Sequence, residues 1–182
     1  MERIDVMMPS RYDREAVAFM WKELQDIGVQ PLSSAAAVDR FLADGEGTSL
    51  LVVNSVCGCA ARMARPAVAL ALQHEVIPDR MGTVFAGVDM DATAKAREYM
   101  PDIAPSSPSV FLFKNGKLVH AVHRSEIEGR HPEDIAGGLI ASFSEHCSAQ
   151  GPSVSPDVVR QIFKLTVAPA CGSSFERPGQ GE

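Results

Sequence analysis

Two cysteines separated by a single residue, Cys57 and Cys59, are the residues of this sequence best suited to chemistry. They follow an apolar run at residues 48–53 and precede an alanine-rich helical segment, so a buried strand is expected to end and a helix to begin there. The N-terminus of a helix carries about half a positive charge and free N–H groups, which favour a thiolate. Cysteines in such places have pKa values of roughly 3.5–7.5. The pattern therefore predicts a reactive thiol at Cys57.

The spacing of the two cysteines permits a disulfide between them only if Cys57 lies outside the helix. Residues two apart on an ideal helix have Cα atoms roughly 5.4 Å apart, within the range of about 4.4–6.8 Å that a disulfide accepts. Their side chains, however, point to nearly opposite sides of the helix. We therefore expect Cys57 to lie outside the helix proper, with Gly58 supplying backbone freedom. A disulfide in so small a ring is expected to be strained and easily reduced, as suits a bond formed to release a substrate.

Two other interpretations of the cysteine pair are ordinary buried residues and metal ligands. A structural zinc site needs four ligands, usually in two close pairs. Here Cys147 and Cys171 are distant, and the five histidines share no ligand spacing, so no metal site is expected. Cys147 is expected to be a spare thiol at the end of the last helix, with a resolving or regulatory role as the alternative. Cys171 is expected to be a spectator, unless a mobile tail brings it to Cys57.

Composition limits the class of protein. The chain has 182 residues, of which 46% are hydrophobic and 22% charged, enough for one α/β domain. A net charge of −6 without a basic run argues against nucleic acid and anionic membranes as partners. No apolar leader follows the first residues and no apolar stretch is long enough to span a membrane, so a cytoplasmic location is expected. No tightly bound cofactor is expected.

Alternating helical and extended patterns predict a mixed central sheet with helices on both faces, an α/β fold. Pro66 is expected to kink or end the first part of the helix after the cysteines, and Asp91 to cap the next one. Asn115 and Gly116 between two apolar runs predict a hairpin. The predicted helices are residues 11–27, 35–42, 60–74, 91–99, 132–147 and 157–165, and the predicted strands 29–32, 48–53, 83–88, 109–113 and 118–122. Residues 1–147 are expected to form the domain, and residues 148–182 a Pro/Gly/Ser-rich tail with one short helical segment.

Several stretches resemble the bacilliredoxins, thioredoxin-like proteins that have also been described as disulfide isomerases. The resemblance covers about residues 10–147, and the combination of motifs is highly specific. The matching stretches are residues 53–61 (VNSVCGCAA), 64–66 (ARP), 84–87 (VFAG), 95–99 (KAREY), 105–109 (PSSPS) and 126–129 (EIEG).

The resemblance implies a thioredoxin-like fold and the removal of bacillithiol, a low-molecular-weight thiol, from mixed disulfides with client proteins. Bacillithiol would be a co-substrate, and bacillithiolated proteins the partners. Cys57 would attack and take the bacillithiol; Cys59, or a second bacillithiol, would resolve the mixed disulfide. Pro108 would be the cis-proline that thioredoxin-like folds place beside their cysteines, an ordinary trans loop proline being the alternative.

Two departures from thioredoxins leave questions open. Thioredoxins have two residues between their cysteines, whereas this sequence has one, so their redox behaviour does not carry over. They also bury an acidic residue near the second cysteine, and residues 50–53 contain none. Arg62 and Arg65 are candidates for stabilising the thiolate, with solvated helix positions as the alternative. General disulfide exchange or isomerisation, and a metal- or redox-sensing binding module, remain competing functions.

Overall fold

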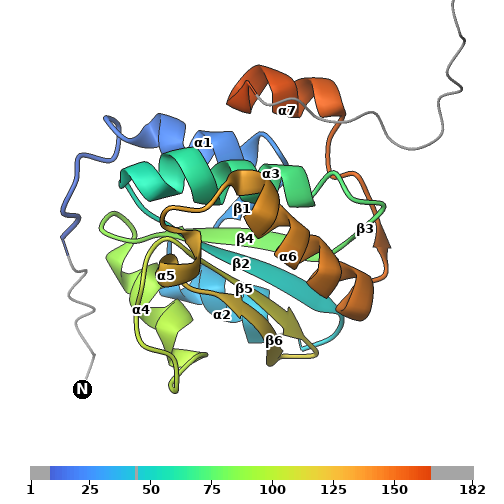
Figure 1. The fold of residues 1–182 in the computed structure, drawn as a ribbon. Helices are drawn as coiled ribbons and strands as arrows, with labels where there is room; N and C mark the ends of the chain where they lie inside the picture. The colour runs from blue at the N-terminus through green and yellow to red at the C-terminus, as the bar shows by residue number, and fades with distance from the viewer. Residues whose placement is uncertain (1–8, 44, 165–182) are drawn as a thin grey trace, which may run out of the picture.

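A five-stranded mixed sheet forms the centre of the protein, in the order β1-β4-β2-β5-β6 (Figure 1). The structure is a computed structural model and describes residues 9–43 and 45–164. The first three strands in this order are parallel, and β5 and β6 run antiparallel to their neighbours. The strands of this sheet are β1 (Gln30–Pro31), β2 (Thr48–Asn54), β4 (Arg80–Phe85), β5 (Ser109–Lys114) and β6 (Lys117–Val122).

The central strand β2 is the apolar run that precedes the cysteines. All seven of its residues are buried, because helices cover both faces of the sheet. Leu50 and Val52 belong to the core on one face, and Leu51 and Val53 to the core on the other. The strand therefore holds its own C-terminal end, and the cysteines that follow, in a fixed position.

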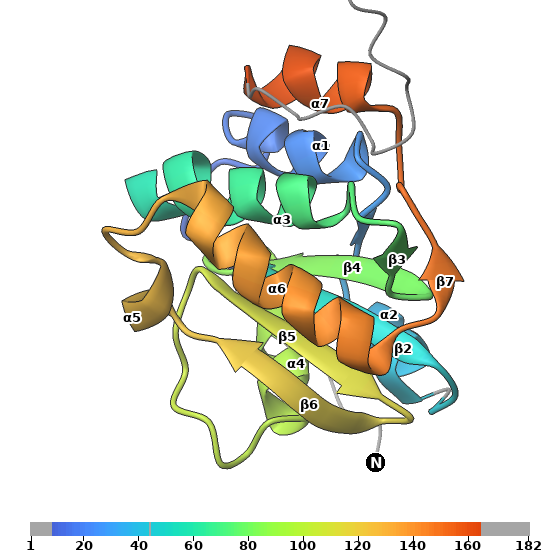
Figure 2. The ribbon, with the colours of Figure 1, turned by 45° about the vertical axis from the view of Figure 1, so that its right-hand side comes forward.

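Helices α1 (Ala18–Gln25), α3 (Arg65–Ala71) and α6 (Pro132–His146) cover one face of the sheet. Helices α2 (Ala35–Ala43) and α4 (Met90–Glu98) cover the other, as Figure 2 shows. The predicted α/β fold, a mixed central sheet with helices on both faces, is confirmed. The predicted hairpin is also confirmed, since β5 and β6 are joined through Asn115 and Gly116, both with positive φ angles of 50° and 73°.

Helix starts differ from the prediction in two places. Helix α1 begins at Ala18 and not near residue 11, because the Asp13 carboxylate accepts hydrogen bonds from the N–H groups of Glu15 and Ala16 and holds a turn there. Helix α4 begins after Asp89, so Asp91 lies in its first turn and is not its cap.

A second, two-stranded sheet pairs β3 (Val76–Ile77) with β7 (Ala149–Gln150), and neither strand is long enough to show a sequence period. Helix α7 (Pro156–Phe163) follows, and its Val159 is fully buried against the main core. The chain therefore continues to pack on the domain after residue 147.

The division into a domain and a tail at residue 147 stays a prediction. Cys171 lies outside the described residues.

None of the helices in the described residues has the length and apolar character needed to cross a membrane.

Candidate active site

The two cysteines lie just beyond the C-terminal end of β2, where the chain turns into a helix. The Cys57 carbonyl accepts a hydrogen bond from the Ala61 N–H at 3.2 Å, which starts the first helical turn. The next turn, Ala60–Ala64 (η1), is π-helical and becomes the α-helix α3 at Arg65. This change comes one residue before Pro66, where a break was predicted, because proline lacks the N–H that a continuing α-helix needs. Single π-helical turns inside helices are frequent at functional sites.

The sulfur of Cys57 is surrounded by hydrogen-bonding groups. It lies 3.2 Å from Ser55 Oγ, 2.9 Å from Cys59 Sγ and 3.4 Å from the Ala60 backbone nitrogen. Burial acts to raise the pKa of this thiol, but the hydrogen bonds from Cys59, Ser55 and Ala60 outweigh it and hold the pKa below its ordinary value. The site therefore favours a thiolate at Cys57.

The pKa of Cys59 is shifted in the opposite direction, above its ordinary value. Burial raises the pKa of its thiol, and the hydrogen bond to Cys57 and the negative charge of Cys57 raise it further, whereas Arg124 acts to lower it. Both cysteines are half-buried free thiols. The pair therefore has a built-in asymmetry: Cys57 is suited to attack first, and Cys59 to remain protonated beside it.

Ser55→Ala is expected to raise the pKa of Cys57, because the thiolate loses a hydrogen-bond donor at 3.2 Å. At neutral pH the rate of Cys57 alkylation by iodoacetamide should fall about threefold to tenfold, and it should recover as the pH rises. The measurement is the pH dependence of that rate. Ser144→Ala, on an exposed position of α6, is the control, and an identical pH profile for both variants would contradict the role of Ser55.

Arg65 does not act as the predicted neighbour of the thiolate. Its side chain is almost fully buried, at 1% exposure, and its Nε donates to Glu23 Oε2 at 2.7 Å. Its Nη1 donates to Asn54 Oδ1 at 3.2 Å and to the Ser55 carbonyl at 3.4 Å. Arg65 therefore fixes the turn between β2 and Cys57 from inside the protein. Arg62 is exposed, which agrees with a solvated helix position.

A cation that does act on the pair is Arg124, at the start of the short helix α5 (Arg124–Ile127), which acts to lower the pKa of Cys59. Its Nη1 donates to the Ser107 carbonyl at 3.2 Å, and its Nε lies 3.5 Å from Glu128 Oε2. The Ser107–Pro108 peptide bond is cis, and Pro108 is buried. Arg124 thus links the loop before β5 to the cysteine site. The sequence offered one signal for it, its position two residues before the EIEG stretch.

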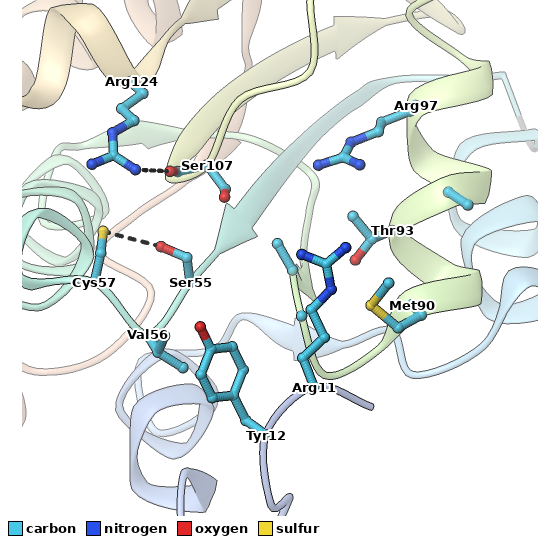
Figure 3. A pocket seen from close by; sticks show the side chains of 13 residues that line it. Arg11, Tyr12, Ser55, Val56, Cys57, Met90, Thr93, Arg97, Ser107 and Arg124 are labelled. Carbon is cyan, nitrogen blue, oxygen red and sulfur yellow. Dashed lines mark hydrogen bonds between the residues drawn. The ribbon is translucent and has the colours of Figure 1, made fainter. Parts of the chain in front are cut away.

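A cavity of about 440 Å³ opens beside Cys57 (Figure 3). Ser55, Val56 and Ser107 line it next to the sulfur, and α4 and the segment at residues 11–12 form the opposite side. Its size is that of a small-molecule site. The cavity therefore gives a small molecule access to the thiol of Cys57, and sequence reasoning alone did not find it.

Gly58, between the two cysteines, and Cys147, at the end of α6, are also residues that the sequence analysis singled out. Gly58 has no positive φ angle, and a Cβ there would meet nothing within 4 Å, so the reduced form shown here does not require glycine at this position. Cys147 follows the last residue of α6, and burial raises the pKa of its thiol. Among the described residues no cluster of three or more histidine, cysteine or acidic side chains could hold a metal ion.

Comparisons with known proteins place this chain in a family. The family model described as "Disulphide isomerase" matches residues 12–147. A bacilliredoxin of Shouchella clausii is 48% identical over 141 residues, which cover 78% of this chain and 97% of that protein. A bacilliredoxin of Halalkalibacterium halodurans is 47% identical over 136 residues, which cover 75% of this chain and 94% of that protein.

Solved structures similar to this one include the Fasciola hepatica thioredoxin, with a TM-score of 0.45 and 18% identity over 65% of this chain and 99% of the other.

The bacilliredoxin relatives, together with the mixed sheet and its paired thiols, define the class of protein, a thiol–disulfide oxidoreductase. Within that class, the chain belongs to the bacilliredoxin family.

Proposed function

We propose that this protein removes bacillithiol from mixed disulfides with client proteins, with Cys57 as the nucleophile and Cys59 as the resolving thiol. The observation that carries the proposal is the asymmetry of the pair. Two sulfur atoms lie 2.9 Å apart, and their surroundings lower the pKa of Cys57 and raise that of Cys59. A low pKa gives a thiolate at neutral pH, and the thiolate is the attacking form in disulfide exchange.

In the first step the Cys57 thiolate attacks the bacillithiol sulfur of the mixed disulfide. A bond forms between Cys57 and bacillithiol, the bond between bacillithiol and the client breaks, and the client cysteine leaves as a thiolate. No net oxidation takes place in this exchange. The cavity beside Cys57 supports attack on the bacillithiol sulfur and not on the client sulfur, because the cavity's volume suits a small thiol better than a folded client.

In the second step the Cys59 thiolate attacks Cys57, a Cys57–Cys59 disulfide forms, and bacillithiol leaves as a thiolate. The dithiol is oxidised by two electrons and the mixed disulfide is reduced by two. The first step prepares the second, because the mixed disulfide removes the negative charge on Cys57 that raises the pKa of Cys59. A low-molecular-weight thiol or dithiol reductant then returns the pair to its reduced form.

Arg124→Gln is expected to slow the second step. Arg124 favours the Cys59 thiolate, so its loss raises the pKa of Cys59. The release of bacillithiol in a single turnover should slow about twofold to fivefold at neutral pH and recover at higher pH. Stopped-flow measurement of the release gives the rate, with Arg130→Gln as the control, an exposed arginine on the following loop. Equal release rates for the two variants would remove Arg124 from the resolving step.

The test of the proposed function compares two substrates of the wild-type protein. One is a reporter protein whose single cysteine carries bacillithiol, and the other is a protein with scrambled disulfides and no bacillithiol. We expect rapid release of bacillithiol from the first and slow reactivation of the second. Rapid reactivation of the scrambled protein, without release of bacillithiol from the reporter, would instead establish a general disulfide isomerase.

A further inference from the structure

The side of the cavity opposite Cys57 carries two arginines that form no ion pair with any residue the structure describes. Arg11 and Arg97 both line the cavity, and Figure 3 shows their guanidinium groups directed into it and toward each other. Within residues 9–43 and 45–164, neither side chain forms an ion pair. With Arg124 on the Cys57 side, the described residues that line the cavity include three arginines and no carboxylate.

This charge pattern runs against the composition of the chain. The protein has 23 acidic residues against 17 lysines and arginines, so an average surface would supply acidic neighbours. Arg11 and Arg97 are both exposed, so solvent screens part of their mutual repulsion, and an anion bound in the cavity would offset the rest. Planar guanidinium groups are also the side chains best matched to carboxylates, which they bind through paired N–H groups.

A buried hydroxyl on the same wall points to the same ligand chemistry. Thr93 lines the cavity one helical turn before Arg97 on α4, and only 4% of its surface is exposed. Its Oγ1 is buried and has no hydrogen-bond partner among the described residues. A buried hydroxyl without a partner is unfavourable, and a ligand oxygen in the cavity would satisfy it.

The fold also fixes the segment that carries Arg11, although this segment precedes the first helix. The Arg11 N–H donates to the Gly87 carbonyl at 2.8 Å. The ring of Tyr12 packs so closely on Gly87 that a Cβ there would come within 2.8 Å of it. Gly87 also has a φ of +87°, so both the close approach of Tyr12 and the backbone conformation favour glycine at this position. The backbone of Arg11 is therefore held at the cavity wall.

We propose that Arg11, Arg97 and Thr93 form a carboxylate-binding subsite that selects which small thiol Cys57 accepts. The ligand class is a low-molecular-weight thiol that bears one or more carboxylates, bound with its sulfur toward Cys57. The inference rests on the proposed function, because it assigns the cavity to the small-thiol half of the mixed disulfide. The exchange itself is the first step described above, with the same bond formed and the same bond broken.

The experiment keeps the client constant and varies the charge of the small thiol. One reporter protein carries on its single cysteine either mercaptosuccinate, which has two carboxylates, or cysteamine, which has an ammonium group. In a Cys59→Ala background, intact-mass kinetics give the rate constant for transfer of each thiol to Cys57. The quantity compared is the ratio of the mercaptosuccinate rate constant to the cysteamine rate constant.

We expect this ratio to fall about tenfold in the Arg11→Gln/Arg97→Gln variant, since two charge-assisted contacts are lost. It should remain unchanged in Arg40→Gln, an exposed arginine on α2 that does not line the cavity. An unchanged ratio in the double variant would overturn the subsite. An equal fall of both rate constants would overturn it too, since the arginines would then contact the client.

Failure of the proposed function gives a different result from failure of the subsite. If bacillithiol on the same reporter is not transferred to Cys57 at all, the proposed function fails, whatever the charge preference. If bacillithiol is transferred equally fast with and without Arg11 and Arg97, the function stands and the subsite fails. Single variants and Thr93→Val then show whether one group alone sets the preference.

Discussion

Replacement of Cys57 by alanine is expected to reduce the release of bacillithiol from a client protein by at least about a thousandfold, because in the proposed mechanism Cys57 supplies the attacking electron pair. Cys59 cannot take over readily, since burial, which does not depend on Cys57, still acts to raise the pKa of its thiol. The measurement is the rate of bacillithiol release from a bacillithiolated reporter protein under excess enzyme.

The matched control is Cys147→Ala, which removes another half-buried thiol of the described chain. That variant should keep the wild-type rate to within about twofold. If Cys57→Ala releases bacillithiol as fast as Cys147→Ala does, Cys57 is not the nucleophile. If Cys147→Ala loses activity as severely as Cys57→Ala while still folded, the expected spare role of Cys147 is wrong.

Arg65→Met is expected to lower the free energy of unfolding by about 2–4 kcal/mol, the largest effect on stability that we expect from one substitution near the site. The methionine would fill most of the space but leave Glu23 without its partner at 2.7 Å. It would also remove donors to Asn54 Oδ1 and the Ser55 carbonyl. Urea denaturation of the reduced protein measures the change.

Arg62→Met is the control, because Arg62 is exposed and lies on the same helical segment. Its effect should stay within about 0.5 kcal/mol. A loss of stability as large as that of Arg65→Met would show that the segment, and not the buried ion pair, is responsible. A double-mutant cycle with Glu23→Leu isolates the ion pair, and the coupling should vanish if the two residues act independently.

The sequence was sufficient to predict the sheet and the place of the cysteines, because those rest on local patterns. The run at residues 48–53 is apolar throughout, as a strand buried on both faces must be, and β2 occupies it. Asn115 and Gly116 adopt the positive φ angles that their residue types favour in a hairpin. These elements needed no information from distant parts of the chain.

The features that were missed depend on contacts between distant segments. Arg11, Arg97 and Arg124 share a cavity although more than 20 residues separate each from the next, and no sequence period brings them together. Arg65 is in the sequence a candidate for stabilising the thiolate, or else a solvated helix residue, because it follows Cys57 along a helix. Its ion pair with Glu23 instead holds its side chain in the core. Only the packed structure decides which cations of the helix face the sulfur.

The most direct test of the proposed mechanism is the position of the bacillithiol adduct in two variants, each of which lacks one cysteine of the pair. Cys59→Ala and Cys57→Ala are each incubated with a bacillithiolated protein, alkylated at acidic pH, digested and mapped by mass spectrometry. We expect one bacillithiol on Cys57 in the Cys59→Ala variant, and none on Cys59 in the Cys57→Ala variant. An adduct on Cys59 alone, or no adduct in either variant while the wild-type protein retains a metal, would contradict the proposed mechanism.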